Sequence, residues 1–336
     1  MSNKKIGRRR EMKGRFLFGI LASVLLLAFG GQASAEFPDR PITLIANYSA
    51  GGGADLSARA LAKKAEKTLG QPVAVVNRAG AGGTVGMAAI AASKADGYTI
   101  GVSTYGPLTF APHMNDLPYT ALKDFEYIMG YGRYMYGPVA RSDSQFKTLK
   151  DLVAYAKANP GKVKYSLIGL PTPNNFGMVY LAKAEGIKWE PVVFKETPAA
   201  VAACLGGHVD LVSQNPGDVV SYIKAGRFRL LASFSDIRWP WVPDVPTAKE
   251  LGYKFDVNSW LALGAPKGVP KPAMDKLRDA FKRAMDDPEF IEIMNKIYIP
   301  PAYKTAEEYK NLVEVGYKES ETMIRELGLH KSQQKK

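Results

Sequence analysis

Two glycine-rich turns carry the residues of this chain that are best suited to bind a ligand. In the first, SAGGGAD, Gly51, Gly52 and Gly53 separate the apolar run ITLIA from a helical pattern, and Asp55 follows. Glycines let backbone N–H groups approach a ligand without a Cβ in the way, and a helix start adds a positive dipole end. The turn therefore predicts a site for a small anion. Taken alone, it is equally consistent with a tight turn that Asp55 caps without any ligand.

A second turn favours the anion site. The stretch PVAVVNRAGAGGTVG again runs from an apolar strand through glycines to a helix, with Gly82 and Gly83 at the junction and Thr84 able to donate a hydroxyl. In a parallel α/β sheet, ligands bind outside the carboxyl ends of the strands, where both turns would lie. Together the two turns predict a cradle for a small anion.

Other ligand chemistries have less support. Neither turn continues as Gly-Lys-Ser/Thr, which excludes a P-loop. The relaxed dinucleotide pattern of Gly80, Gly82 and Gly86 fails its strict form at Val85. The chain contains neither G-x-S-x-G nor H-E-x-x-H. No catalytic residue and no cofactor is therefore predicted.

The histidines do not form a motif in the sequence. His113, His208 and His330 are scattered along the chain, and no metal site is predicted from them. An exported enzyme acting on carboxylates would have to use Ser103 or Asp218, and neither has a histidine partner in the sequence.

Apolar periodicity predicts an α/β chain. Short apolar runs predict buried strands with helical patterns between them, and this alternation indicates parallel sheets. The predicted strands are residues 42–46, 72–76, 98–104, 163–169, 209–214 and 228–235. The predicted helices are residues 55–69, 83–92, 149–158, 175–184, 199–205 and 219–225, and three further helices follow within residues 271–328.

The chain start has the pattern of an export signal. The basic segment KKIGRRREMKGR precedes the apolar segment FLFGILASVLLLAFGG and a small-residue site ending at Ala35. We predict cleavage after Ala35 and a periplasmic mature protein; an uncleaved membrane anchor is the alternative. The signal holds seven of the 45 Lys and Arg residues and one of the 32 Asp and Glu residues, so its removal lowers the formal charge from +13 to +7. Nearly half of the basicity thus belongs to targeting, and no nucleic-acid partner is predicted.

An ordered series of motifs resembles the periplasmic solute-binding receptors of the Bug family. These TctC-like proteins are the extracytoplasmic receptors of tripartite tricarboxylate transport systems. The resemblance covers essentially the whole mature chain and is carried by FPDRPITLIANYSAGGGADLSARALAKK, GQPVAVVNRAGAGGTVGMAAIAASKADGYTI, CLGGHVDLV, IKAGRFRLLA and VPDVPTAKELGY. It implies an α/β protein of the type II periplasmic-binding-protein fold, in which two α/β lobes are joined by a two-segment hinge with a ligand cleft between them. It also implies that the chain is not an enzyme and holds no cofactor.

The same resemblance implies the domain boundaries. Residues 1–35 would be the cleaved signal peptide, residues 36–138 the N-terminal part of lobe one, and residues 139–258 lobe two. Residues 259–336 would return to lobe one with C-terminal helices and a basic tail. A mature chain of about 300 residues agrees with two lobes rather than one core.

The family's way of holding a carboxylate implies which residues bind the ligand. In family members, backbone N–H groups, hydroxyls and ordered water from the turns of lobe one hold the carboxylate. In lobe one of this chain, the implied ligand-binding residues are Tyr48, Ser49, Gly51, Gly52, Gly53, Ala81, Gly82, Gly83, Thr84, Ser103, Thr104 and Tyr105. In lobe two they are Thr172, Asn174, Thr197, Asn215 and Asp218.

Lobe two departs from the family pattern. In GLPTPNN, Thr172 is kept, but Pro171 replaces a glycine and Asn175 takes the place of a histidine. Glu196 stands where small residues are usual, either as a pocket group or as a solvated residue at the rim. The rim is favoured because a buried unpaired carboxylate is costly. Asp218 either contacts the far end of the ligand or caps the next helix.

The resemblance predicts a monomeric extracytoplasmic receptor that captures a small organic carboxylate by lobe closure. The carboxylate could be an aliphatic di- or tricarboxylate or an aromatic carboxylate, and its identity does not follow from the sequence. The receptor would deliver the ligand to the integral membrane transporter subunits of a tripartite tricarboxylate transporter. A ligand-sensing receptor for a signalling system is one alternative, and an exported enzyme acting on carboxylates is a less supported one.

Overall fold

The computed structural model describes residues 36–170, 172–257 and 259–334. Internal contacts divide the chain into two units, residues 1–39 and 40–336, and every helix and strand named below lies in the second unit. The predicted export signal, residues 1–35, and Pro171 lie outside the described residues. Within the described part of the chain, no helix is long and apolar enough to cross a membrane.

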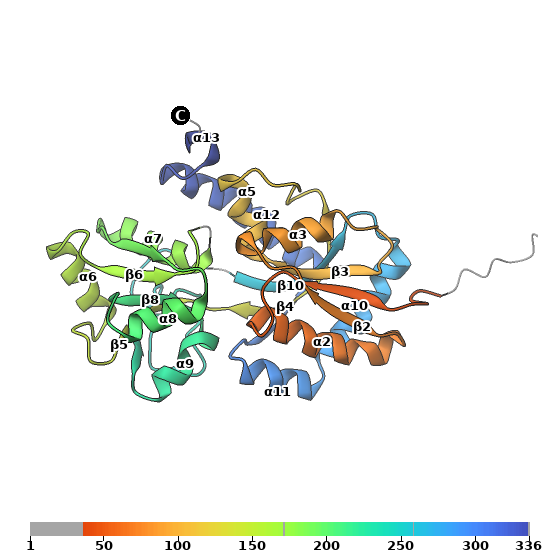
Figure 1. Ribbon diagram of the computed structural model, residues 1–336, viewed down its shortest axis with the longest axis horizontal. Coiled ribbons are helices and arrows are strands. Elements are labelled where there is room, and N and C mark those ends of the chain that lie inside the picture. Colours follow the sequence, from red (N-terminus) through yellow and green to blue (C-terminus); the bar gives the residue numbers. More distant parts are fainter. Residues whose placement is uncertain (1–35, 171, 258, 335–336) are drawn as a thin grey trace, which may run out of the picture. The chain divides into compact units, whose positions relative to one another are not determined.

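The first sheet combines strands from the two ends of the second unit (Figure 1). In spatial order it consists of β11 (Pro301–Thr305), β4 (Phe125–Tyr134), β10 (Ser259–Pro266), β3 (Thr99–Thr104), β1 (Ile42–Ala46) and β2 (Val73–Asn77). β1 pairs in parallel with β2 and β3, whereas β10 is antiparallel to β3 and β4, and β11 is antiparallel to β4. The prediction of a parallel sheet is therefore correct for the N-terminal strands and wrong for the later ones.

Helices from both ends of the unit pack on this sheet. They are α2 (Gly53–Leu69), α3 (Thr84–Ala91), α4 (Tyr105–Thr109), α5 (Ala111–Met114), α10 (Lys271–Met285), α11 (Pro288–Lys296) and α12 (Ala306–Glu326). A short 3-10 turn, η1 (Ala81–Gly83), precedes α3, and α13 (Lys331–Gln334) ends the described chain. Ile90, Leu108 and Tyr309 are fully buried in the core between helices and sheet. Burial of these apolar side chains supplies the main driving force for the packing.

The second sheet comes from one continuous stretch of the chain. In spatial order its strands are β7 (Glu190–Val193), β6 (Lys164–Leu167), β8 (Leu211–Gln214), β5 (Gly137–Arg141) and β9 (Phe228–Leu230). Its helices are α6 (Leu149–Ala158), α7 (Pro173–Glu185), α8 (Thr197–Leu205) and α9 (Pro216–Lys224). β6 is parallel to β7 and β8, and β5 is antiparallel to β8 and β9. Two apolar clusters form its core, one around Tyr165 and Phe234 and the other around Trp239.

The chain passes between the sheets twice. β4 ends at Tyr134 in the first sheet, β5 begins at Gly137 in the second, and the chain returns between β9 and β10. Gly137 pairs with Gln214 of β8, so the second sheet begins slightly before the predicted boundary at residue 138. A Cβ on Gly137 would lie 2.2 Å from the carbonyl oxygen of Ala232. Only glycine fits at this passage.

Candidate functional site

A cavity of about 420 Å³ is lined by residues of both sheets and their helices. Among the predicted ligand-binding residues, those that line it are Tyr48, Gly51, Gly52, Gly53, Gly82, Thr104, Thr172, Asn174, Thr197, Asn215 and Asp218. The predicted residues that are not part of its lining are Ser49, Ala81, Gly83, Thr84, Ser103 and Tyr105. A volume of this size suits a small-molecule ligand.

Besides the five-residue helix α4, four longer helices begin at the cavity. The lining includes Gly52, Gly53 and Ala54 at the start of α2, Thr172 and Asn174 at α7, Thr197 at α8, and Asn215 and Asp218 at α9. The first N–H groups of a helix have no acceptor inside the helix, and the aligned peptide dipoles place a partial positive charge there. α2 belongs to the first sheet and the other three belong to the second, so the cavity is suited to an anion held from both sides.

Asp55 holds the first glycine turn in shape. Helix α2 begins at Gly53, so Asp55 lies inside its first turn rather than capping a helix that starts near residue 56. Its carboxylate accepts the N–H of Gly51 at 2.9 Å and hydrogen bonds from Arg59 at 2.9 Å and Asn77 at 2.8 Å. Burial would raise the pKa of Asp55, but these hydrogen bonds outweigh burial and hold the pKa below its ordinary value. The ionised carboxylate thus fixes the turn without facing the cavity.

Glycine is required where α2 meets the cavity wall. A Cβ on Gly53 would lie 2.7 Å from Cδ1 of Ile299 and 3.0 Å from Oη of Tyr134, both of which also line the cavity. Ser49, in contrast, is exposed, and its carbonyl oxygen accepts the N–H of Gly52 at 3.4 Å. Ser49 therefore shapes the turn from outside, which corrects its predicted place in the cavity.

The second glycine turn reaches the cavity only through Gly82. The hydroxyl of Tyr48 donates to the Gly82 carbonyl at 3.0 Å. A Cβ on Gly83 would lie 3.1 Å from Cζ of Tyr48, so the Tyr48 ring covers this part of the turn. The Thr84 hydroxyl donates to the Ala81 carbonyl at 3.0 Å. Ala81, Gly83 and Thr84 are thus outside the cavity lining, because Tyr48 covers the turn and the Thr84 hydroxyl is bonded within it.

Of the predicted residues Ser103, Thr104 and Tyr105, only Thr104 lines the cavity. Successive residues of a strand point to opposite faces, and the Ser103 side chain faces Gly264 of β10 instead, where a Cβ would lie 2.5 Å from its Oγ. Asn47 donates to Oγ1 of Thr104 at 2.8 Å. Tyr105 begins α4 and packs edge-on against Phe110, away from the cavity. Ser103 and Tyr105 are therefore outside the cavity lining.

In the second sheet, most of the predicted polar side chains are already hydrogen-bonded within the protein. The Thr172 hydroxyl donates to the Gly169 carbonyl at 2.5 Å, so it must rotate before it can donate to a ligand. Asn174 is buried, and its Nδ2 donates to the Ser213 carbonyl at 2.8 Å. Glu196 is exposed and is not part of the lining, as expected for a residue at the rim.

Asp218 is the acidic side chain of the lining. It is partly buried, and its Oδ2 accepts a hydrogen bond from Asn215 at 2.5 Å. It does not cap α9, because the helix begins at Pro216 with Asn215 in the capping position. Burial raises the pKa of Asp218 to about 6, although the Asn215 hydrogen bond acts in the opposite direction. Protonated Asp218 therefore favours the folded state at low pH, and this contribution is lost as the pH rises through about 6.

Several lining residues were missed from the sequence. They include Tyr134, Tyr136, Gln214, Ser259, Lys296, Ile297, Tyr298 and Ile299. Gln214 is 2% exposed, and its Oε1 accepts the N–H of Asn215 at 3.2 Å. Its Nε2 is buried, and no hydrogen-bond acceptor for it is found among the described residues. Its position at the end of a predicted strand, directly before Asn215, was the only signal available for it.

The fold and the cavity define a class of protein. Two mixed α/β sheets, which the chain links twice, are the architecture of periplasmic binding proteins, and the solved structure of the periplasmic binding protein BugD matches with a TM-score of 0.77 and 31% identity over 88% of this chain and 99% of that chain. The chain belongs to the tripartite tricarboxylate transporter family receptors, whose sequence model matches residues 57–329.

Two further relatives support this membership. The chain is 37% identical over 313 residues to the UPF0065 protein in the gbd 5' region of Cupriavidus necator, covering 93% of this chain and 95% of that protein. Among solved structures, MatC from Rhodopseudomonas palustris with bound malate matches with a TM-score of 0.75 and 27% identity, covering 86% of this chain and all of that chain. The predicted resemblance and fold class are thus confirmed.

Proposed function

We propose that this protein is an extracytoplasmic receptor that captures a small organic carboxylate in the cavity between its sheets. The convergence of four helix N-termini on that cavity is the observation that carries this proposal. Helix N-termini bind carboxylates through backbone N–H groups without the cost of burying a cationic side chain. Malate, the ligand bound to the relative MatC, is a carboxylate of suitable size.

Charged groups at the cavity restrict the choice of ligand. Lys296 lines the cavity, but its side chain is 69% exposed and pairs with Glu292 at 2.6 Å. A ligand carboxylate near Lys296 would compete with Glu292 in solvent, so this lysine contributes little. Asp218 would repel a carboxylate placed beside it. We therefore place the principal carboxylate at α2, with the hydroxyl or apolar part of the ligand toward α9.

Capture would proceed by closure of the two lobes. The first sheet and its helices would form lobe one, residues 36–138 and 259–336, and residues 139–258 would form lobe two. A ligand that contacts α2 alone would bind without shifting the balance between open and closed forms, because only differential affinity changes populations. Contacts from Thr172, Thr197 and Asn215 would supply that difference.

Export and delivery complete the proposed role. The signal would be cleaved after Ala35, and the monomeric receptor would pass its carboxylate to the integral membrane subunits of a tripartite tricarboxylate transporter. The test is to measure the affinity of the purified receptor for those subunits with and without the carboxylate. We expect the receptor to bind them more tightly when the carboxylate is present. Equal binding in both conditions would favour a sensor role.

Thermal unfolding against a ligand panel tests the proposed function. The mature protein would be heated with mono-, di- and tricarboxylates, aromatic acids, amino acids and NAD. Ligand at a hundredfold its dissociation constant should add about 2.7 kcal/mol of stability, which corresponds to a rise in Tm of about 5 °C or more. A rise confined to one class of carboxylate supports the proposal. A rise with NAD alone would contradict it.

The pH dependence of binding should report on Asp218. At pH 7 the Asp218 carboxyl is mostly ionised, since its pKa is about 6, and it opposes an anionic ligand. Affinity for the carboxylate identified by the panel should therefore rise about tenfold from pH 7 to pH 5, if the ligand binds only the protonated form. Isothermal titration calorimetry at several pH values would measure this rise, and Asp218→Asn should remove it.

Asp143→Asn is the matched control, because the Asp143 side chain is 77% exposed and outside the cavity. Titration of the ligand itself affects all three proteins equally and cancels in the comparison. The same pH dependence in Asp218→Asn as in the parent protein would show that Asp218 does not face the ligand.

A further inference from the structure

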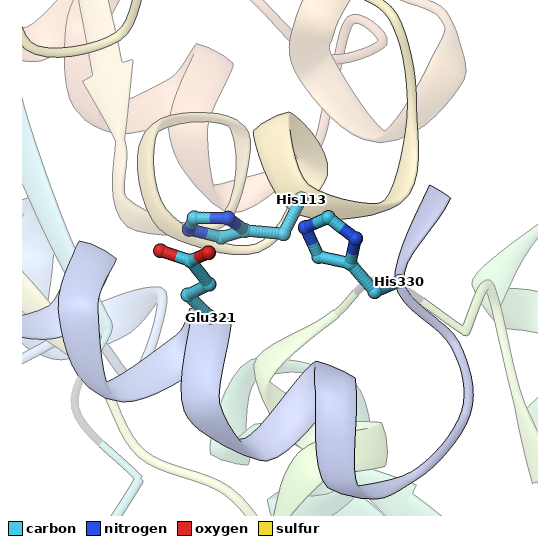
Figure 2. A group of neighbouring side chains, drawn as sticks. All are labelled: His113, Glu321 and His330. Atoms are coloured by element: carbon cyan, nitrogen blue, oxygen red, sulfur yellow. The ribbon is translucent and has the colours of Figure 1, made fainter. Parts of the chain in front are cut away.

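Three side chains that are far apart in the sequence meet on the outside of the first sheet. His113 lies on α5, Glu321 on α12, and His330 in the turn after α12 (Figure 2). One nitrogen or oxygen atom of each lies within 4.8 Å of the others. His113 and His330 are scattered along the chain, as the sequence shows, but the structure brings them together with Glu321.

His113 already has the tautomer of a metal ligand. It is 3% exposed, and its Nε2 lies 2.9 Å from the Tyr317 carbonyl oxygen. A carbonyl only accepts hydrogen bonds, so Nε2 carries the proton and Nδ1 keeps a free lone pair. A backbone carbonyl on the second ring nitrogen is the usual arrangement for a histidine that binds a metal.

Glu321 has one oxygen free for a cation. Its Oε1 accepts hydrogen bonds from Nε of Arg325 at 2.9 Å and from Nη2 at 2.7 Å. No hydrogen bond to Oε2 is found within the described part of the chain. The hydrogen bond from Arg325 lowers the pKa of Glu321, so the carboxylate is ionised at neutral pH.

His330 can present its Nε2. It is 6% exposed, and its Nδ1 lies 2.8 Å from Oγ of Ser332 and 3.2 Å from the backbone nitrogen of Ser332. The backbone N–H of Ser332 donates to Nδ1, so metal binding at Nε2 would move the imidazole proton to Nδ1, which would then donate to the Ser332 hydroxyl.

We propose that His113, Glu321 and His330 form a binding site for a divalent transition metal, with zinc as the expected ion. Two imidazoles and one carboxylate are a ligand set that zinc accepts, with water in the fourth position. Ligand atoms around tetrahedral zinc lie about 3.3 Å apart, given bonds of about 2.0–2.1 Å, so the three side chains close by about 1.5 Å or less. His330 follows Gly328, whose φ is 70°, in a short turn that can make this movement.

The charges around the site permit a cation. Arg325 and Lys331 are the basic neighbours, but Arg325 is paired with Glu321, and Lys331 is paired with Asp116 at 3.1 Å. The Tyr317 ring packs on the His113 ring, with centroids 4.2 Å apart, and shields one side of it. Glu321 is partly exposed and gives the ion access from solvent.

A metal at this site would fasten the C-terminal turn to α5. Lys331 already contacts this region through Asp116 and, at 3.4 Å, the Asn115 carbonyl. The metal would add a covalent-strength link between segments that are more than two hundred residues apart in the chain. Its effect should therefore appear as stability, independently of carboxylate binding.

Zinc titration of the untagged, EDTA-treated mature protein tests the site. We expect one zinc ion per chain by isothermal titration calorimetry, a rise in Tm with zinc, and visible absorption from cobalt bound in place of zinc. His330→Ala and Glu321→Gln should each weaken binding by at least about tenfold. His113→Ala should abolish the cobalt absorption.

His208→Ala is the matched control, because His208 is exposed on the second sheet and is the remaining histidine of the chain. It should bind zinc like the parent protein. If His113→Ala does not fold, His330→Ala and Glu321→Gln, which change the periphery of the site, carry the test. Failure of the parent protein to bind zinc, or equal binding by the parent protein and His330→Ala, would overturn the site.

Discussion

Replacing Gln214 with leucine is expected to weaken carboxylate binding by about two- to tenfold. Gln214 lines the cavity, and its buried Nε2 is without an acceptor among the described residues. Its Oε1 is held by the N–H of Asn215, which leaves the amide nitrogen as the group available to a ligand. A hydrogen bond to the ligand hydroxyl, which we place toward α9, contributes about 0.5–1.5 kcal/mol, which corresponds to this loss of affinity.

The same substitution should leave the ligand-free protein about as stable as before. An unsatisfied buried donor costs free energy, so leucine removes a penalty while it loses only weak bonds to Asn215. Calorimetry would measure the dissociation constant, and thermal unfolding without ligand would measure the stability. Gln145→Leu is the control, because Gln145 is exposed and outside the cavity. Unchanged affinity in Gln214→Leu would remove this side chain from the site.

Gly316→Ala should destabilise the protein by about 3 kcal/mol, although alanine in place of a helical glycine usually stabilises by up to about 1 kcal/mol. Gly316 is buried in α12, where a Cβ would lie 1.7 Å from Oη of Tyr105 and 2.5 Å from its Cζ. Tyr105 is itself buried against Phe110, so its ring has little room to withdraw. The steric cost therefore outweighs the gain in helix propensity.

A second substitution separates the two effects. Combining Gly316→Ala with Tyr105→Leu removes the ring that meets the new Cβ, so the double variant should lose less stability than the two single variants added together. Lys318→Ala, at an exposed position of the same helix, is the control for propensity alone. Urea unfolding would measure the stability of the parent protein, the two single variants, the double variant and Lys318→Ala. A Gly316→Ala protein as stable as the parent would mean that Tyr105 can move.

Sequence patterns predicted those helices and strands whose ends are fixed by neighbouring residues. The helix predicted at residues 149–158 coincides with α6, where Thr148 and Asp151 form a capping box. The strands β4 and β11 were missed, because β4 pairs only with strands that are distant in the sequence. Whether a segment such as SWLALGAP is a strand depends on which strands flank it in space.

The candidate site likewise contains residues that local sequence patterns reveal and residues that only the packed structure reveals. The glycine turn before α2 could be recognised from its residues, since Gly51 adopts a φ of 81° and the helix follows at once. Ser103 and Thr104 could not be separated, because the face of a strand that meets the cavity depends on its neighbours. Gln214 and Ile299 reach the cavity from positions that only the packed structure brings together.

The positions of the strands in the sequence determine which sheet can be completed first as the chain is synthesised. Every strand of the second sheet lies between Gly137 and Leu230, so that sheet can be complete while later residues are still being added. β4 of the first sheet is flanked by β10 and β11, which end at Thr305. Its backbone N–H and C=O groups stay without strand partners until the last part of the chain emerges. Until then, the incomplete chain exposes the unpaired edges of β4, and unpaired strand edges promote aggregation. We therefore expect aggregation to decrease when the C-terminal segment is synthesised rapidly.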